Sequence, residues 1–219
     1  NYFLNNHDIS RSSSRYWPNE QDDRAKVAAV MLLTLRGTPF LYYGEEIGMR
    51  NISLKRDEIL DPPGKKYWPI YKGRDVCRSP MQWNDNPYAG FSTQNPWLPV
   101  HPNYVSRNVD KQKADGNSLF NVYRQLIAIR RHEPALQHGD FLPIQTQSTN
   151  ALVYLRQLDN RMIFVALNFS NRAQTVNLTS ALWKKNWALL FSTNRSTTPE
   201  FRQGAFALLP NEACLLITK

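Results

Sequence analysis

The sequence contains little cysteine and no long apolar run, and each shortage argues against a class of protein; no secretory leader pattern opens it, which excludes little because Asn1 begins almost inside a predicted strand. The two cysteines among 219 residues, Cys77 and Cys214, lie far apart in unlike surroundings, so they predict neither a disulfide framework nor a metal-binding motif. No segment supplies the roughly 18 to 20 consecutive apolar residues that a membrane-spanning helix needs. Without a leader pattern, a reducing, cytoplasmic location is the default expectation, and the Asn-x-Ser/Thr sequons are interpreted as chance matches.

Acidic residues are outnumbered by basic ones: the sequence has 18 Asp and Glu and 27 Lys and Arg, which gives a formal net charge of +9. A nucleic-acid-binding module would gather its basic side chains in runs or on one face. Here they are scattered, with short doublets such as Arg130-Arg131 and Lys184-Lys185. We therefore expect neither nucleic acid nor a membrane as a partner, and a basic nucleic-acid module is the last of three hypotheses.

The opening residues change abruptly from apolar to polar. Tyr2-Phe3-Leu4 is followed by Asn5-Asn6-His7-Asp8, which is typical of a buried parallel strand that ends at a functional site. In an arbitrary protein, an Asn-His-Asp triplet is more often a turn with a solvated histidine. Because Asn1 begins almost inside this strand and no initiator Met precedes it, we expect the chain to be the C-terminal part of a longer polypeptide.

The next segment predicts one βαβ unit. A polar, serine-rich loop with Arg11 and Arg15 leads to a helix that begins at Asp22 and ends before Gly37. The apolar run Phe40–Tyr43 predicts a second buried strand. Units of this kind form parallel sheets with right-handed crossovers. Two strands cannot form a stable parallel sheet alone, which supports the expectation that earlier strands belong to the same protein.

Two charged motifs follow the second predicted strand. Glu45 and Glu46 are adjacent, and adjacent strand residues point to opposite faces, so we interpret them as structural. Residues 47 to about 116 form a long excursion rich in aromatic residues and proline, which predicts a packed segment. Within it, Arg74 and Arg78 either hold sugar hydroxyls and set the charge of Asp8, or pair with acidic residues and merely pin the loop. Their spacing favours neither alternative.

The rest of the chain predicts a helix and then an all-β region. The helix begins at Ser118, a good N-cap, and ends near His132, before Pro134. From about Phe141, short apolar runs alternate with turn residues, which indicates an antiparallel sandwich. No polar cluster suited to catalysis occurs in it. With 42% hydrophobic residues in 219, the chain is long enough for one or two domains with their own cores.

Several motifs together resemble the end of the catalytic barrel in the α-amylase superfamily, glycoside hydrolase family 13. They are Asn5-Asn6-His7-Asp8, Arg15, Gly37–Met49, Gly73–Trp83, Ala89-Gly90-Phe91 and Pro96–Val100. The later motifs are similar to those of the α-glucosidase and oligo-1,6-glucosidase branch. The resemblance implies an α/β plus all-β fold: residues 1–139 would form strands seven and eight of a (β/α)8 TIM barrel, the long loop and the closing helix. Residues 140–219 would form a β-sandwich, domain C.

The resemblance also implies a retaining mechanism with a covalent glycosyl-enzyme. The nucleophilic Asp and the acid/base Glu of the family follow barrel strands four and five, and neither strand is expected in this chain. Asp8 matches the third carboxylate, which stabilises the transition state. His7, Asn6 and Arg74 match positions that bind the sugar. The expected ligand is an α-glucoside oligosaccharide, with no cofactor; no residue is assigned as a metal ligand, because no complete set of oxygen ligands for calcium occurs, and calcium dependence is left open.

The first hypothesis is therefore part of a retaining α-glucosidase that hydrolyses or transglycosylates short α-glucosides and is inactive by itself. The alternative is a non-enzymatic barrel relative, such as the heavy subunit of an amino-acid transporter. The intact His7-Asp8 pair argues against this alternative. Cut barrel strands would expose unpaired edges, so oligomers through these edges are a further expectation. The linkage preference, α-1,4 or α-1,6, is left open.

Overall fold

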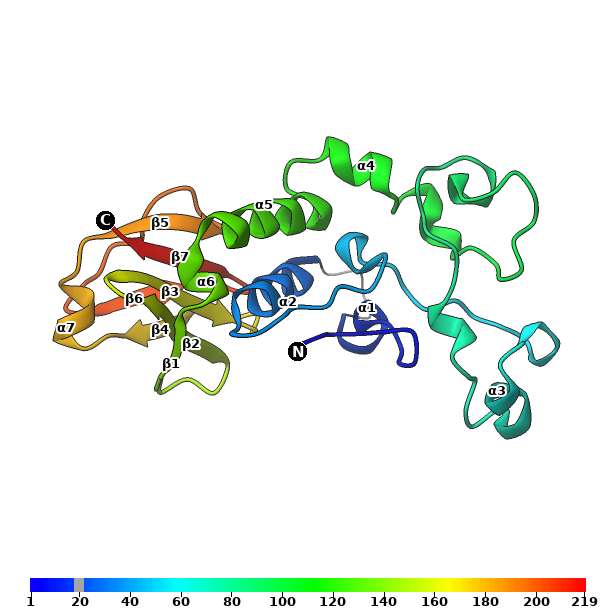
Figure 1. The fold of residues 1–219 in the computed structure, drawn as a ribbon, viewed down its shortest axis with the longest axis horizontal. Helices are drawn as coiled ribbons and strands as arrows, with labels where there is room; N and C mark the ends of the chain where they lie inside the picture. The colour runs from blue at the N-terminus through cyan, green and yellow to red at the C-terminus, as the bar shows by residue number, and fades with distance from the viewer. Residues whose placement is uncertain (18–21) are drawn as a thin grey trace. The chain divides into compact units, whose positions relative to one another are not determined.

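The computed structural model describes residues 1–17 and 22–219 (Figure 1). By packing, the chain divides into two compact units. The first consists of Asn1–Asp22 and Phe40–Tyr123, and the second of Asp23–Pro39 and Arg124–Lys219. The domains predicted from the sequence, 1–139 and 140–219, stay a prediction.

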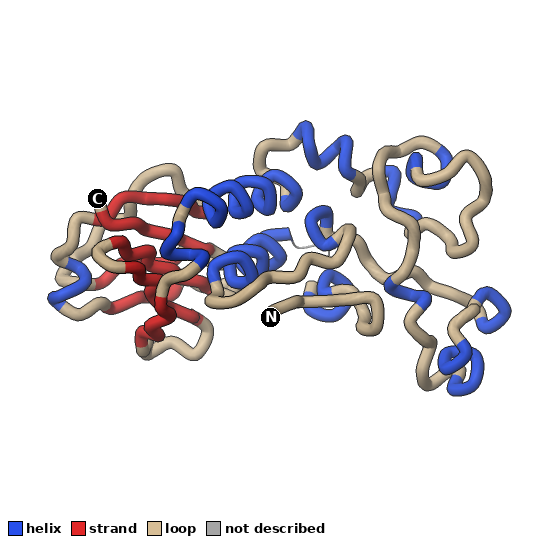
Figure 2. Tube along the Cα trace, viewed as in Figure 1, coloured by secondary structure: helices blue, strands red, loops and turns tan. Residues whose placement is uncertain are grey.

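The second unit contains two antiparallel sheets, drawn in red in Figure 2. The larger sheet has the order β1 (Asp140–Ile144), β2 (Ala151–Leu158), β3 (Arg161–Asn168), β7 (Ala213–Thr218) and β5 (Trp187–Ser192). The smaller sheet pairs β4 (Gln174–Asn177) with β6 (Ala205–Leu208). A short helix, α7 (Ser180–Trp183), lies between β4 and β5 in the chain. The predicted series of short antiparallel strands is confirmed.

The two sheets share one apolar core. Phe164 of β3 and Phe206 of β6 are both buried, and their ring centroids are 5.9 Å apart. Val153 from the larger sheet and Val176 and Leu208 from the smaller sheet belong to the same cluster. Alternate residues along each strand point to the same face, so Phe164 and Ala166 of β3 both contribute to this core.

Helix α6 (Pro134–Gln137), residues 23–34 of α2 (Asp22–Thr34) and residues 124–132 of α5 (Leu119–His132) belong to the second unit. The two longer helices were predicted. Ser118 caps α5 as expected, because its Oγ accepts the Asn121 N–H at 3.2 Å. The apolar stripe of α5 is buried at Leu119 and Leu126, but Ile127 is 38% exposed. Ile127 therefore lies outside the buried face of the helix.

Arg156 joins α2, α6 and β2 inside this unit. Its side chain is fully buried. Its guanidinium donates to the carbonyl oxygens of Thr34 at 2.6 Å, Leu136 at 2.9 Å, Gly139 at 2.9 Å and Asp140 at 3.4 Å. The last carbonyls of a helix lack partners within the helix and favour a cation. Arg156 thus satisfies the carboxyl ends of two helices from the middle of a strand.

The first unit is mostly irregular and contains short helical segments. They are α1 (Ser12–Tyr16), η1 (Glu45–Ile47), η2 (Arg56–Glu58), α3 (Pro62–Tyr67), η3 (Asp75–Cys77), η4 (Pro87–Gly90), η5 (Pro102–Val105) and α4 (Val109–Ala114). Buried apolar side chains from the long excursion form a cluster that includes Ile52, Ile59 and Leu98. The expectation that the excursion is packed is confirmed.

Two predictions for the first unit are wrong in this structure. Neither Tyr2–Leu4 nor Phe40–Tyr43 is a strand. The two segments are joined by the Phe40 N–H, which donates to the Tyr2 carbonyl at 2.8 Å. A parallel strand needs a ladder of hydrogen bonds to its neighbours, and the described residues supply no such ladder here. Apolar side chains of these segments are correspondingly open to solvent, with Phe3 51% and Phe40 53% exposed.

The segment predicted as a polar loop after Asp8 also differs, because it contains α1 and a buried arginine. Arg11 is fully buried and stacks on Tyr42 and Tyr43, with its Cζ 4.9 Å and 4.8 Å from the ring centroids. It donates to the Tyr43 carbonyl at 2.7 Å. Stacking on aromatic faces suits a weakly hydrated guanidinium, which explains how a charged residue in a polar segment becomes buried.

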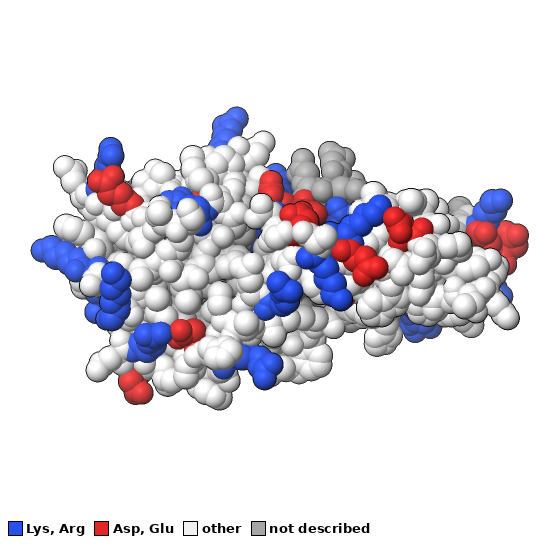
Figure 3. Space-filling model, turned by 90° about the horizontal axis from the view of Figure 1, so that it is seen from above, with Lys and Arg blue, Asp and Glu red and all other residues white. Residues whose placement is uncertain are grey.

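Charged side chains are mixed on the face shown in Figure 3, where Lys and Arg lie among Asp and Glu rather than in one basic patch. In the described part of the chain, no helix combines the length and the apolar character needed to cross a membrane. Cys77 and Cys214 are both buried free thiols.

Candidate active site

The Asp8 carboxylate lies within reach of three cationic or polar side chains. Its Oδ1 is 3.4 Å from Arg74 Nη1 and 3.3 Å from Arg78 Nη2, and its Oδ2 is 3.3 Å from His7 Nε2. The Asp8 side chain is 48% exposed. The structure therefore brings together three predicted site residues, His7, Asp8 and Arg74, and leaves the carboxylate accessible.

Local hydrogen bonds determine the backbone that carries Asp8. Asn6 Oδ1 accepts the N–H of Asp8 at 2.8 Å and that of Ile9 at 3.1 Å, which is an Asx turn. Arg78 Nε donates to the His7 carbonyl at 2.8 Å. The Asn6 oxygen thus shapes the turn, and the role of Asn6 in substrate binding stays a prediction.

Arg74 is held by a second carboxylate, that of Asp61, which no sequence motif indicated. Asp61 Oδ1 accepts from Arg74 Nε at 3.1 Å and from Nη2 at 2.6 Å, while Asp61 Oδ2 accepts the Arg74 backbone N–H at 3.0 Å. The Arg74 guanidinium hydrogen-bonds this carboxylate and holds the pKa of Asp61 below its usual value. Arg74 therefore pins the loop by pairing with an acidic residue, and its Nη1 also faces Asp8; its role in sugar binding stays a prediction.

No pattern in the sequence connects Asp61 to the site, because it lies far from Asp8 along the chain, in an irregular loop. The pairing depends on how residues 61 and 74 fold back on one another. A usable signal was the local motif that contains both Arg74 and Arg78, which predicted two guanidiniums near Asp8.

Glu45 lies in η1 rather than on a strand, so the argument that adjacent strand residues diverge does not apply to it. Its side chain is buried, and its Oε1 accepts from the Tyr123 hydroxyl at 2.8 Å. Burial raises the pKa of Glu45 to about 7, although the Tyr123 hydrogen bond opposes this shift. Burial also raises the pKa of Glu46. Glu45 is therefore a core residue in this unit.

The raised pKa of Glu45 predicts a pH-dependent stability. The folded value of about 7 lies above the ordinary 4.5, so the contribution of Glu45 is complete below pH 4.5 and is lost as the pH rises through 7. Glu45→Gln should gain stability relative to the wild type with rising pH, by about 3 kcal/mol at pH 8. Urea unfolding at several pH values measures this difference. Exposed Glu200→Gln is the control, and a pH-independent difference for Glu45→Gln would contradict the prediction.

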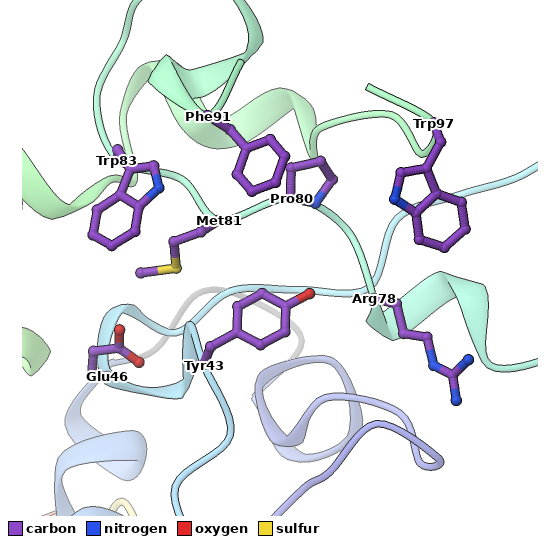
Figure 4. A pocket seen from close by; sticks show the side chains of 8 residues that line it. All are labelled: Tyr43, Glu46, Arg78, Pro80, Met81, Trp83, Phe91 and Trp97. Atoms are coloured by element: carbon purple, nitrogen blue, oxygen red, sulfur yellow. The ribbon is translucent and has the colours of Figure 1, made fainter. Parts of the chain in front are cut away.

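His7, Asp8, Arg74 and Arg78 are called the Asp8 cluster below. An aromatic pocket of about 410 Å³ adjoins this cluster, because Arg78 also lines the pocket (Figure 4). In Figure 4 the Tyr43 ring lies across the pocket from Pro80 and Met81, and Glu46 and Arg78 lie at opposite ends. The Tyr43 hydroxyl donates to the Ser79 carbonyl at 2.7 Å and so ties the two walls together. The remaining lining residues are Trp83, Phe91 and Trp97.

A second pocket of about 400 Å³ also adjoins the Asp8 cluster, because His7 is one of its lining residues. Its other lining residues are Asn1, Phe3, Asn5, Asn6, Phe40, Leu41 and Tyr42. It therefore combines aromatic surface with amide and imidazole groups, as sites for small polar ligands do. In the described residues, no three His, Cys, Asp or Glu side chains gather in a way that could hold a metal ion.

Comparison with known sequences places most of this chain in one family. The family described as "Alpha amylase, catalytic domain" matches residues 1–139. A probable alpha-glucosidase from Rhizobium meliloti is 38% identical over 177 residues, which cover 80% of this chain and 32% of that protein. An oligo-1,6-glucosidase from Parageobacillus thermoglucosidasius is 34% identical over 210 residues, covering 87% of this chain and 37% of that protein. The chain thus spans about a third of the length of these curated relatives.

Solved structures are similar to nearly the whole chain. Trehalulose synthase MutB from Pseudomonas mesoacidophila MX-45 superposes with a TM-score of 0.85 at 29% identity, covering 100% of this chain and 43% of that one. A MutB mutant in complex with glucose gives a TM-score of 0.84 with the same identity and coverage. Trehalose-6-phosphate hydrolase TreA from Bacillus licheniformis gives 0.87 at 27% identity, covering 99% of this chain and 43% of that one.

Proposed function

This chain belongs to the α-amylase family, and from that premise we propose that it supplies the transition-state carboxylate and sugar-binding residues of a retaining α-glucosidase. The observation that carries the proposal is the position of Asp8. Its carboxylate is accessible, lies beside His7 and two arginines, and is flanked by two pockets to which Arg78 and His7 contribute.

Asp8 acts on charge that develops during the reaction. A retaining glycosidase passes through an oxocarbenium-like transition state, in which the sugar ring becomes positive and flattens. A fixed carboxylate stabilises that state more than the neutral ground state, and it does so best when it needs no reorientation. Arg74 and Arg78 both contact Asp8 Oδ1, so they hold the carboxylate in one orientation before the substrate arrives.

His7 and Arg74 orient the sugar. The imidazole of His7 and the Nη1 group of Arg74 flank the carboxylate on different oxygens, so a sugar at Asp8 would meet hydrogen-bond donors on both sides. Hydrogen bonds to sugar hydroxyls that strengthen as the ring flattens contribute several kcal/mol in such enzymes. The substrate class is short α-glucosides, which the names of the glucosidase relatives and the glucose complex of a MutB mutant support.

The remaining catalytic groups come from outside this sequence. Retaining hydrolysis needs a nucleophilic carboxylate and an acid/base carboxylate on opposite sides of the scissile bond, and the family places these after barrel strands four and five. We assign residues 1–139 to the end of a (β/α)8 barrel and residues 140–219 to its β-sandwich domain. Under this proposal the chain binds the sugar and carries the carboxylate that stabilises the transition state, but it does not turn substrate over by itself.

The test compares the chain alone with a fusion on p-nitrophenyl α-glucoside. The fusion joins residues 1–219 to the part of the Rhizobium meliloti relative upstream of its matched region. We expect no turnover by the chain and sustained turnover by the fusion, because the fusion combines all three carboxylates. If the chain alone shows sustained turnover and Asp8→Asn abolishes it, the claim that the nucleophile and the acid/base lie outside residues 1–219 is contradicted. A folded but inactive fusion would contradict the assignment of this chain to an α-glucosidase.

A further inference from the structure

We propose that Asp61 is a positioning residue, which fixes the Arg74 guanidinium so that its Nη1 group faces the Asp8 carboxylate and the sugar bound there. The inference rests on the proposed function and adds a residue to it. The side-chain contacts that the structure describes for Asp61 are with Arg74 and not with the Asp8 carboxylate. It acts through Arg74, whose three contacts with Asp61 involve the backbone N–H, Nε and Nη2.

The nitrogens of the Arg74 guanidinium have different partners: Nε and Nη2 bind Asp61, and Nη1 faces Asp8. Nε and Nη2 of Arg74 both donate to Asp61 Oδ1, at 3.1 Å and 2.6 Å. Nη1 lies 3.4 Å from Asp8 Oδ1. Because a guanidinium is planar and rigid, holding one edge fixes the direction of the remaining nitrogen. A lysine at position 74 would supply charge without this geometry.

Asp61 is itself anchored by a third carboxylate. Asp75 is buried, and its Oδ2 accepts the backbone N–H groups of Leu60 and Asp61, each at 2.7 Å. The Asp61 side chain in turn accepts the backbone N–H of Arg74 at 3.0 Å. Side-chain-to-backbone hydrogen bonds therefore run from residues 60–61 to Asp75 and from Arg74 to Asp61. These bonds hold the Asp61 backbone in place without the Arg74 guanidinium.

The loop backbone leaves just enough room for this arrangement. Gly73 has a φ of +79°, and a Cβ at that position would lie 2.8 Å from Asp61 Oδ2. A Cβ on Gly64 would lie 2.9 Å from the Gly73 Cα. Because neither residue has a Cβ, the two backbone segments can approach closely enough to bring the Asp61 carboxylate against Arg74. The side chain of Asp61 is 1% exposed, so water does not compete for its oxygens.

A purely structural ion pair would stabilise the loop but would not need to control catalysis. The two roles differ in what Asp61→Asn changes. Asparagine keeps the volume and one acceptor oxygen, so the fold is retained while the paired hydrogen bonds to Nε and Nη2 weaken. Positioning predicts that Arg74 then becomes mobile and that transition-state stabilisation falls, because misplacing an orienting group by about 1 Å can cost about 10²-fold in rate.

The experiment has two arms, with Asp57→Asn as the matched control because Asp57 is an exposed carboxylate of the same loop. In the chain itself, NMR follows the exchange of the Arg74 Nε–H with solvent. In the active fusion, kcat and KM are measured for p-nitrophenyl α-glucoside. For Asp61→Asn we expect faster Nε–H exchange and a fall in kcat/KM of about 10²-fold, carried mainly by kcat. Asp57→Asn should match the wild type in both arms.

The outcomes separate this inference from the proposed function. Unchanged Nε–H exchange in Asp61→Asn would overturn the inference, even if the fusion is an α-glucosidase. Faster exchange with unchanged kcat/KM would show that the order of Arg74 does not matter to the reaction, and would also overturn it. If Asp61→Asn does not fold, Arg74→Lys tests the same guanidinium geometry, because lysine keeps the charge but not the planar group. A wild-type kcat in Arg74→Lys would refute the positioning role of Asp61. Failure of the proposed function appears instead as an inactive wild-type fusion.

Discussion

Replacing Asp8 by asparagine in the active fusion is expected to lower kcat by about 10³-fold while leaving stability unchanged. Removing a single preorganised electrostatic group at a developing charge costs about 10² to 10³ in kcat. Asp8 should lie at the upper end, because its full negative charge faces the oxocarbenium ion. The asparagine keeps the side-chain shape and one oxygen for Arg74 and Arg78, so the loss reports charge rather than misfolding. Steady-state kinetics and thermal unfolding of the same preparations measure the two effects.

The controls for this substitution separate charge from local structure. Asp57→Asn makes the same chemical change at an exposed position of the same unit and should leave kcat within about twofold. The loss in Asp8→Asn should fall on kcat more than on KM, since an interaction made only in the transition state lowers kcat and kcat/KM together. A fall below tenfold, with an intact fold, would show that the carboxylate does not stabilise the transition state.

Replacing Arg156 by methionine is expected to destabilise the second unit by about 4 kcal/mol or more. Four backbone carbonyls accept from the Arg156 guanidinium. Methionine fills similar space but donates nothing, and each buried acceptor left without a donor costs about 1–3 kcal/mol. Burial lowers the pKa of Arg156 to about 10, so the group remains a cation at neutral pH. The carbonyls at the ends of α2 and α6 would lose this charge.

Urea unfolding followed by far-UV circular dichroism measures this effect. The matched control is Arg202→Met, because the Arg202 side chain is 83% exposed and pairs with the similarly accessible Glu200. Exposed ion pairs contribute about 0.2–1 kcal/mol, so this control should remain close to the wild type. A loss of less than about 1 kcal/mol in Arg156→Met would mean that the unit rearranges to satisfy the four carbonyls in another way.

Local sequence patterns determined those features of the protein that depend on neighbouring residues. Short apolar runs separated by turn residues predicted the antiparallel strands, and β3 (Arg161–Asn168) is one such run. Signals at the helix ends likewise predicted α2 and α5. The adjacent pair His7 and Asp8 and the motif around Arg74 predicted a candidate site, and the structure brings these residues together; polar residues after an apolar run are visible without any knowledge of contacts.

Only the tertiary structure decided which distant groups meet. The partner of Arg74 is Asp61, the cap of α2 and α6 is a strand arginine, and Glu45 lies against Tyr123; no local period encodes these pairings. The same reason explains why the apolar runs Tyr2–Leu4 and Phe40–Tyr43 are not strands here, since a parallel strand exists through its neighbours. Residue order therefore determined the local elements and the candidate carboxylate, whereas long-range packing decided burial, pairing and the direction in which Arg74 points.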